Sequence, residues 1–422
     1  MYRSVGPIMP VLLGVACMEV ALGALSPLVG IQLVRQSVPT ELIGLITSAY
    51  FAGFLAGTLT AHHVIDRVGH VRAFSALAAV AANATLLHIV VRDPLAWGLW
   101  RMAIGYAIAG MFVIIESWLN DKATSENRGR IFALYSVVSW GAAGIGPLAL
   151  NYGDADGTQL FAVITMVLAC ALLPLALPTT GNPEIGHRSH FGIARLYRIS
   201  PLGVTACFGA GLINTSLWGL LPVYATKSGI GAPEVSLLLS TSVIGALLVQ
   251  IPIGALSDRF GRRPLMLATC LGGVAVALTV AALGTLSFAL LLGLTALLSS
   301  FAAPLYALGV GQTNDYIVRQ DFVAASAGLL FAWGLGSSVG PALAAAVMGP
   351  LGPRGLFVFL AGGLGAIAIV VVIRILRRRA LRPEQQSSFV AVPQSQGSYG
   401  APELDPRGAP VAGPVLPPDV ID

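Results

Sequence analysis

The chain has 422 residues, of which 56% are hydrophobic and only 10% are charged, and its mean hydropathy is +0.81. Apolar stretches of about 18 residues or more recur along it, which soluble domains do not show. This composition excludes a soluble globular protein. The basic residues behind the net charge of +5 are scattered through short loops, which excludes a nucleic-acid-binding surface.

Twelve membrane crossings are predicted in chain order, each a continuous apolar run. They span about 8–32, 42–62, 73–91, 95–119, 131–150, 159–178, 199–225, 234–256, 265–283, 286–311, 323–347 and 355–376. The runs do not alternate between apolar and polar residues, so they indicate helices, which satisfy their own backbone hydrogen bonds in lipid. The predicted fold is an all-α, polytopic membrane protein with twelve transmembrane helices.

The basic residues of alternate loops predict the orientation of these helices. With a cytoplasmic N-terminus, the inner segments hold eighteen Lys and Arg residues and the outer loops hold four. By the positive-inside rule, both termini then face the cytoplasm. A bacterial inner membrane is the expected location.

The two halves of the chain repeat each other. Asp66 and Asp258 lie 192 residues apart, and Trp140 and Trp333 lie 193 apart. Six crossings per half give both halves the same orientation, which is typical of two pseudo-symmetric six-helix lobes related by an axis along the membrane normal. The predicted domains are an N-terminal lobe over 1–178, a cytoplasmic linker over 179–198, a C-terminal lobe over 199–376 and a disordered, proline-rich tail over 377–422.

A charged loop, GALSDRFGRRP, interrupts the apolar sequence between the eighth and ninth crossings. Its residues Gly254, Asp258, Arg259, Gly261, Arg262 and Arg263 match the pattern G-x-x-x-D-R-x-G-R-[RK]. The first half carries a partial copy with Asp66, Arg67 and Gly69, in which His62 and His70 replace the usual Gly and Arg. Both loops resemble the signature of major facilitator superfamily transporters.

Other segments carry the same resemblance over about residues 8–376. Arg101 and Gly105 fit an R-x-x-x-G pattern, and Gly146 with Pro147 resembles part of a motif of proton-linked exporters. Residues 116–130 resemble the YcaD-like group within the superfamily. The resemblance implies that the charged loops form one side of a reversible latch between the lobes; the alternative is that their arginines only set topology.

A helix kink or gate is predicted where Gly-Pro pairs repeat late in the fifth and eleventh crossings. The pairs are Gly146 with Pro147 and Gly340 with Pro341. Trp140 and Trp333 precede these pairs and are predicted to take part in helix packing or gating.

Three ionisable residues lie well inside the predicted crossings, where a charge costs several kcal/mol. Glu19 lies in the first crossing, and Arg101 and Glu116 lie in the fourth. The resemblance implies that both helices line a central cavity, so all three are predicted to bind substrate or couple protons. Alternatives are a static Glu19–Arg101 ion pair and, for Glu116, hydration or pairing with a nearby arginine.

The second lobe offers uncharged polar groups in its seventh crossing. Asn214 and Trp218 lie four residues apart on one helix face and are predicted to contact the solute. The alternatives are a hydrogen bond from Asn214 to a neighbouring helix and simple packing of Trp218.

The predicted function is secondary active transport of a small organic solute by alternating access, coupled to protons, with a slight tilt to efflux. No nucleotide-binding loop is present, and no cofactor, metal or enzymatic activity is expected. The expected partners are the solute, protons and membrane lipid, and the expected state is a monomer. The alternative is a transport-inactive membrane sensor or assembly protein with the same fold.

Overall fold

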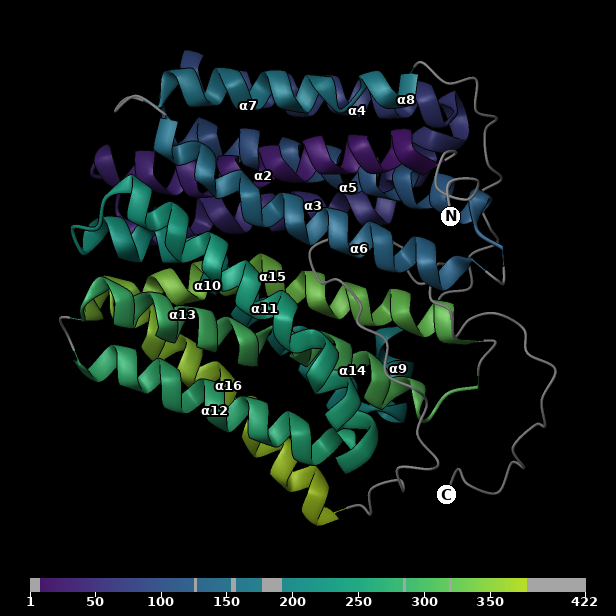
Figure 1. The fold of residues 1–422 in the computed structure, drawn as a ribbon, viewed down its shortest axis with the longest axis vertical. Coiled ribbons are helices and arrows are strands. Elements are labelled where there is room, and N and C mark those ends of the chain that lie inside the picture. The colour runs from purple at the N-terminus through teal and green to yellow at the C-terminus, as the bar shows by residue number, and fades with distance from the viewer. Residues whose placement is uncertain are drawn as a thin grey trace.

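Two bundles of helices lie side by side in the computed structural model (Figure 1). It describes residues 8–124, 127–152, 157–176, 192–283, 286–318 and 321–377. The described residues form helices and connecting turns and contain no strand, so the all-α prediction is confirmed.

The first bundle holds the helices of the N-terminal half. They are α2 (Met9–Arg35), α3 (Thr40–Val68), α4 (His70–Val90), α5 (Pro94–Lys122), α6 (Arg128–Ile145), the 3-10 helix η2 (Gly146–Tyr152), α7 (Thr158–Cys170) and α8 (Leu173–Ala176). The second bundle holds the C-terminal half. Its helices are α9 (Ile193–Ile199), α10 (Pro201–Lys227), α11 (Ala232–Phe260), α12 (Arg262–Leu283), α13 (Phe288–Ala302), α14 (Pro304–Asn314), α15 (Phe322–Leu351) and α16 (Gly355–Arg377).

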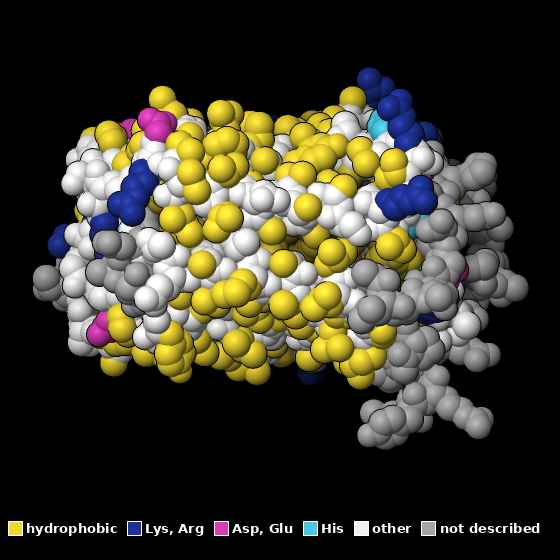
Figure 2. Space-filling model, turned by 90° about the horizontal axis from the view of Figure 1, so that it is seen from above, with side chains coloured by type: hydrophobic (Ala, Val, Ile, Leu, Met, Phe, Trp, Pro, Cys, Tyr) yellow, Lys and Arg dark blue, Asp and Glu magenta, His cyan; other side chains and the backbone are white. Residues whose placement is uncertain are grey.

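Eleven helical spans in the described residues are long and apolar enough to cross a membrane, and α7 is a shorter apolar helix. The sixth predicted crossing, 159–178, corresponds to α7 and α8, so the structure is consistent with twelve crossings. On the face seen in Figure 2, hydrophobic side chains cover the middle of the molecule, while charged side chains gather toward its two ends. This distribution matches a protein surrounded by lipid at its middle.

Two predicted segments fall largely outside the described residues. The linker 179–198 is described only from residue 192, and most of that part belongs to α9. The tail 377–422 is described only at Arg377, the last residue of α16.

The two halves make the same turn at equivalent positions. Gly69, between α3 and α4, has φ +83°, and Gly261, between α11 and α12, has φ +87°. An L side chain is strained at such φ values, which explains why both charged loops carry glycine there. The turn lets two long helices leave the same end of the bundle close together.

Contacts between the bundles are concentrated toward one end. We call it the closed end; it contains the turn over 36–39 and the turn over 228–231. There α3 packs against α15, α2 against α10, and α11 against α6 and η2. The opposite end, which carries the charged loops around Gly69 and Gly261, is called the basic end.

The contacts extend from the closed end to the middle of the helices. Gly30 of α2 lies against Val223 of α10, and Gly44 of α3 lies against Pro341 and Ala345 of α15. Toward the middle of the helices, the rings of Phe54 and Trp333 meet with centroids 6.4 Å apart. The structure therefore represents a state in which the lobes are held together at the closed end.

Candidate solute and proton site

The three predicted charged residues are all buried in the first lobe. Glu19 of α2 is 4% exposed, and Arg101 and Glu116 of α5 are 3% and 0% exposed. None of them faces lipid, which agrees with the high cost of a charge in hydrocarbon. Their functional roles stay predictions.

Arg101 is held by a hydroxyl and an aromatic ring. Its Nη2 donates to Ser26 Oγ at 3.5 Å, and its guanidinium carbon lies 4.5 Å from the centroid of the Tyr50 ring. The ring face is attractive to a cation. Arg101 Nε has no hydrogen-bond partner among the described residues. A buried cation with a spare donor is thus available for an incoming acceptor.

Gly105 explains how Tyr50 reaches Arg101. It lies one turn after Arg101 in α5, and a Cβ at this position would overlap the Tyr50 carbonyl oxygen. Because glycine has no side chain, α3 approaches α5 closely, as small residues allow between membrane helices. The R-x-x-x-G pattern therefore places a charge and the close contact that positions its aromatic partner on one helix face.

Arg101 contacts the helix that carries Glu19, but it does so at Ser26. Ser26, the α2 residue that Arg101 contacts, lies seven residues beyond Glu19, which is about 10 Å along a helix. The static ion pair considered from sequence is absent among the described contacts of Arg101.

Glu116 is bonded to a tyrosine inside the lobe. The Tyr135 hydroxyl of α6 donates to Glu116 Oε1 at 3.1 Å, and both side chains are 0% exposed. The burial of Glu116 is at odds with the alternative of a hydrated carboxylate.

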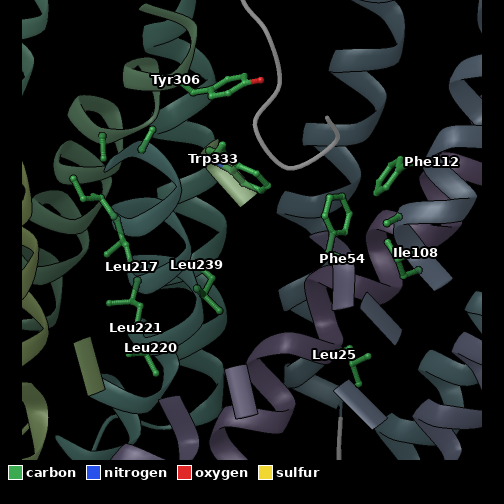
Figure 3. Packing of buried hydrophobic residues seen from close by; sticks show 14 of the residues in the cluster. Leu25, Phe54, Ile108, Phe112, Leu217, Leu220, Leu221, Leu239, Tyr306 and Trp333 are labelled. Carbon is green, nitrogen blue, oxygen red and sulfur yellow. The ribbon is translucent and has the colours of Figure 1, made fainter. Parts of the chain in front are cut away.

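Aromatic side chains from both lobes meet at the level of these charges. Trp333 and Tyr306 lie on one side of the space between the lobes, and Phe54 and Phe112 lie on the other (Figure 3). The Tyr306 and Trp333 centroids are 6.4 Å apart. The predicted packing role of Trp333 fits its contact with Phe54 across the lobes.

Trp218 also packs between the lobes. Its ring meets Trp140 of α6 edge-to-face, with centroids 5.6 Å apart. The indole N–H groups of Trp218 and Trp333 have no hydrogen-bond partner among the described residues. Contact with a solute stays a prediction for Trp218, and its unpaired donor is compatible with that role.

Asn214 connects helices within the second lobe. Its Nδ2 donates to the backbone oxygens of Ala210 at 3.0 Å and Ala302 at 3.2 Å, which joins α10 to α13. The structure therefore favours the alternative of a helix-to-helix hydrogen bond. The Asn214 Oδ1 atom has no partner among the described residues.

The complete charged loop is tied to its own lobe. Arg262 donates to Asp315 through Nε at 2.6 Å and Nη2 at 3.1 Å, and Arg263 donates to the Tyr316 hydroxyl at 2.8 Å. Gly254 and Asp258 lie in the last turns of α11, where Arg259 stacks on the neighbouring Phe260 ring at 5.3 Å. A latch between the lobes stays a prediction.

The partial loop of the first lobe is built differently. His70 is buried, and its Nε2 lies 3.1 Å from Ser117 Oγ. Asp121, which corresponds to Asp315, forms an exposed ion pair with Lys122 at 2.7 Å. Asp66 and Arg67 are exposed in the last turn of α3.

Sequence reasoning missed Asp315 as the partner of Arg262. The dipeptide Asn-Asp occurs at residues 120–121 and again at 314–315, an offset of 194 that matches the internal repeat. The repeated Asn-Asp dipeptide is the sequence signal that would have pointed to Asp315.

The two Gly-Pro pairs have different structures. The α-helix α6 ends at Ile145 and continues as the 3-10 helix η2 from Gly146, with Gly23 of α2 directly opposite. The helix α15 continues through Gly340 and Pro341. The first pair thus marks a change of helix type, whereas a kink at the second stays a prediction.

Metal ligands do not cluster in the described residues. No group of three or more His, Cys, Asp or Glu side chains is suitably placed there to hold a metal ion. The neighbouring rings of His62 and His63 lie with centroids 3.9 Å apart and are tilted by 32°.

Two bundles of membrane-spanning helices, built on one repeat and bringing buried charges and aromatic rings to their boundary, define a two-lobed polytopic transporter. The model of the Major Facilitator Superfamily matches the chain over residues 11–233 and 203–411. The chain belongs to this superfamily, which confirms the resemblance seen in its motifs.

Curated relatives match nearly the whole chain. The uncharacterized MFS-type transporter YcaD of Salmonella paratyphi A is 27% identical over 389 residues, covering 91% of this chain and 98% of the relative. The YcaD protein of Salmonella typhimurium is 27% identical over 383 residues, covering 89% and 97%. These relatives agree with the YcaD-like resemblance of residues 116–130.

Solved structures share the fold at low identity. The nucleoside transporter NupG has a TM-score of 0.73 at 15% identity and covers 88% of this chain and 99% of its own. A bacterial homolog of the human lysosomal transporter Spinster, inward-facing and unoccupied, has a TM-score of 0.65 at 15% identity, covering 88% and 95%. The fucose:proton symporter FucP of E. coli has a TM-score of 0.56 at 16% identity, covering 88% and 99%. The chain is a transporter and not an enzyme.

Proposed function

We propose that the protein moves a small organic solute by alternating access and couples this movement to protons. Membership of the superfamily supports secondary transport. The fucose:proton symporter, one of the structurally similar proteins, provides a precedent for proton coupling on this fold. The Gly146–Pro147 pair favours efflux as the direction.

The observation that carries the proposal is the setting of Arg101. This cation is 3% exposed and contacts a hydroxyl and a ring, with its Nε unpartnered among the described residues. An arginine stays protonated in proteins, so its charge is permanent. A permanent buried cation stabilises an anion nearby, either on the solute or on Glu19.

Glu19 is the proposed proton carrier. Arg101 of α5 contacts Ser26 of α2, the helix that carries Glu19, so a change of distance between α2 and α5 alters the balance between protonated and ionised Glu19. Movement of the lobes changes the hydration of the same carboxylate. Proton binding on one side of the membrane and release on the other follow from such a change.

The solute site is proposed at the boundary of the lobes, beside Phe54, Trp333 and Tyr306. Aromatic rings provide apolar contact, and Arg101 and Glu116 provide opposite charges at different depths. This combination suits a zwitterionic or weakly acidic organic solute. With the orientation predicted by the positive-inside rule, the closed end faces outward and the site opens toward the cytoplasm.

Transport in liposomes tests the proposal. Purified protein is reconstituted with an imposed pH gradient, and amino acids, small carboxylates and cationic drugs are screened for gradient-dependent flux. The Glu19→Gln variant is expected to lose the response of flux to the pH gradient, because an amide does not titrate. Full gradient response by this variant would contradict the role of Glu19.

Glu234→Gln is the matched control. Glu234 is an exposed carboxylate in the first turn of α11, so its loss removes the same charge outside the site. Its gradient response is expected to equal that of the unmodified protein.

A further inference from the structure

We propose that Ser48 and the backbone N–H of Ala342, the residue after Pro341, form a hydrogen-bonded lock between the lobes at the closed end. The two residues belong to α15 and α3, helices that pack against each other along the boundary between the bundles. The inference rests on the proposed function, because a lock acts only if the lobes separate during transport.

Pro341 leaves a gap in the hydrogen bonds of α15. Proline has no N–H, so the carbonyl of residue 337, four positions earlier, loses its helical donor, and the ring crowds that carbonyl. The Ser337 oxygen instead lies 3.4 Å from Thr215 Oγ1 of α10, whose hydroxyl also bonds Gly211 at 2.7 Å. The carbonyl that Pro341 leaves without a helical donor is thus bonded within the second lobe.

The donor after the proline is used by the opposite lobe. The backbone N–H of Ala342 donates to Ser48 Oγ at 3.0 Å, across the boundary between α15 and α3. A side chain that inserts into the i→i−4 hydrogen bonds of a helix is one recognised cause of a local break in them, and a proline beside that point favours such a break. Ser48 is only 7% exposed, so the bond is sheltered from water in this state.

Gly44 brings the two backbones close enough for this bond. It lies one turn before Ser48, and a Cβ there would overlap Ala345 and lie 2.7 Å from the Pro341 oxygen. When the lobes separate, water replaces the partner of both the Ser48 hydroxyl and the Ala342 N–H. The net contribution of such an exchanged bond is small, which suits a contact that must open repeatedly.

The repeat-related interface does not use this device. Thr241 lies 193 residues after Ser48, is half-buried, and donates to the Leu237 oxygen of its own helix at 2.6 Å. The contact of α11 with η2 instead has a side-chain bond from Ser236 Oγ to Asn151 Oδ1 at 3.3 Å. The lock therefore acts at one of two pseudo-equivalent interfaces.

Distance measurements across the closed end test the lock. Spin labels are attached to cysteines at Gln36 and Arg354, exposed positions in the first and second lobe, in a background without native cysteines. Double electron–electron resonance in nanodiscs then reports the ratio of open to closed populations. The variants are Ser48→Ala, Pro341→Ala and their combination.

Ser338→Ala is the matched control. Ser338 lies within one turn of Pro341, and its hydroxyl bonds Gly334 of its own helix at 2.8 Å. Ser48→Ala is expected to raise the ratio of open to closed populations about fivefold, the bias of one neutral hydrogen bond. Pro341→Ala is expected to raise the ratio similarly. It restores an ordinary helix, in which the Ala342 N–H bonds within α15 instead of to Ser48. The combination is expected to exceed neither single change.

Two results separate failure of the lock from failure of transport. Equal distributions for Ser48→Ala and Ser338→Ala, in a protein with two distance populations and measurable flux, would overturn the lock alone. One unchanging distance for every variant, with no flux, would overturn transport and the lock together. If the effects of Ser48→Ala and Pro341→Ala on the ratio of open to closed populations add fully in the combined variant, the two residues do not act through one hydrogen bond. That result would also overturn the lock. If Pro341→Ala does not fold, the two serine variants decide.

Discussion

At the scale of single residues, Arg101 shows how a membrane helix carries a permanent charge. Its guanidinium is not neutralised by a carboxylate among the described residues but is spread over the Ser26 hydroxyl and the Tyr50 ring. Such partners stabilise a cation less than an ion pair does. The arginine is thus buried yet still able to attract an anion.

Arg101→Lys tests the need for this geometry. A lysine keeps the charge but loses the planar group that stacks on Tyr50 and reaches Ser26 at the same time. We expect flux in liposomes to fall by about tenfold or more, equivalent to about 1.4 kcal/mol, with unchanged expression. Flux equal to that of the unmodified protein would show that charge alone suffices.

At the scale of helices, glycine determines which side chains can meet. Gly105 allows α3 to approach α5, and Gly53 of α3 lies against the Met102 backbone in the same interface. Without a hydrophobic driving force between helices in lipid, such close contact supplies much of their association. The site around Tyr50 depends on this contact.

Gly105→Ala is expected to destabilise the first lobe. The added Cβ would overlap the Tyr50 carbonyl, and overpacking of this kind costs about 1–3 kcal/mol. The measurement is the thermal unfolding midpoint in detergent, which should fall.

Gly98→Ala is the control on the same helix. A Cβ there meets only Ile46 at an ordinary 3.8 Å, so the midpoint should hold or rise slightly. Equal midpoints for the two variants would argue against the proposed tight contact.

At the scale of the whole molecule, the contacts described above join the two lobes at the closed end, through α3 with α15 and α2 with α10. At the basic end, Arg262 and Arg263 are bound inside the second lobe through Asp315 and Tyr316. If these arginines contact the first lobe in another state, that contact must compete with bonds present here. The proposed latch therefore acts on the equilibrium between this state and the other one.

Asp258→Asn tests the latch. The substitution keeps the size of the side chain and the topology set by the arginines, but removes a charge from the end of α11. We expect altered flux with normal membrane insertion, measured on reconstituted protein and by fractionation of membranes. Unchanged kinetics would leave the loop with a role in topology only.

The amino-acid sequence by itself determined that the chain crosses a membrane as helices, because runs of about twenty apolar residues are compatible only with lipid or a buried core. It also determined the repeat, the charged loops and the superfamily. The internal charges Glu19, Arg101 and Glu116 were recognisable because ionisable residues are costly in such runs.

Only the tertiary structure decided which groups meet. The partners of Arg101, Glu116 and Ser48 lie on other helices, and Ser48 and Ala342 are 294 residues apart in the chain. Composition and spacing predict how far along its helix a residue lies. They do not predict how the helix is rotated about its axis or which helix packs against it. Both follow from close packing at glycines such as Gly44 and Gly105, where a single methyl group would separate the helices.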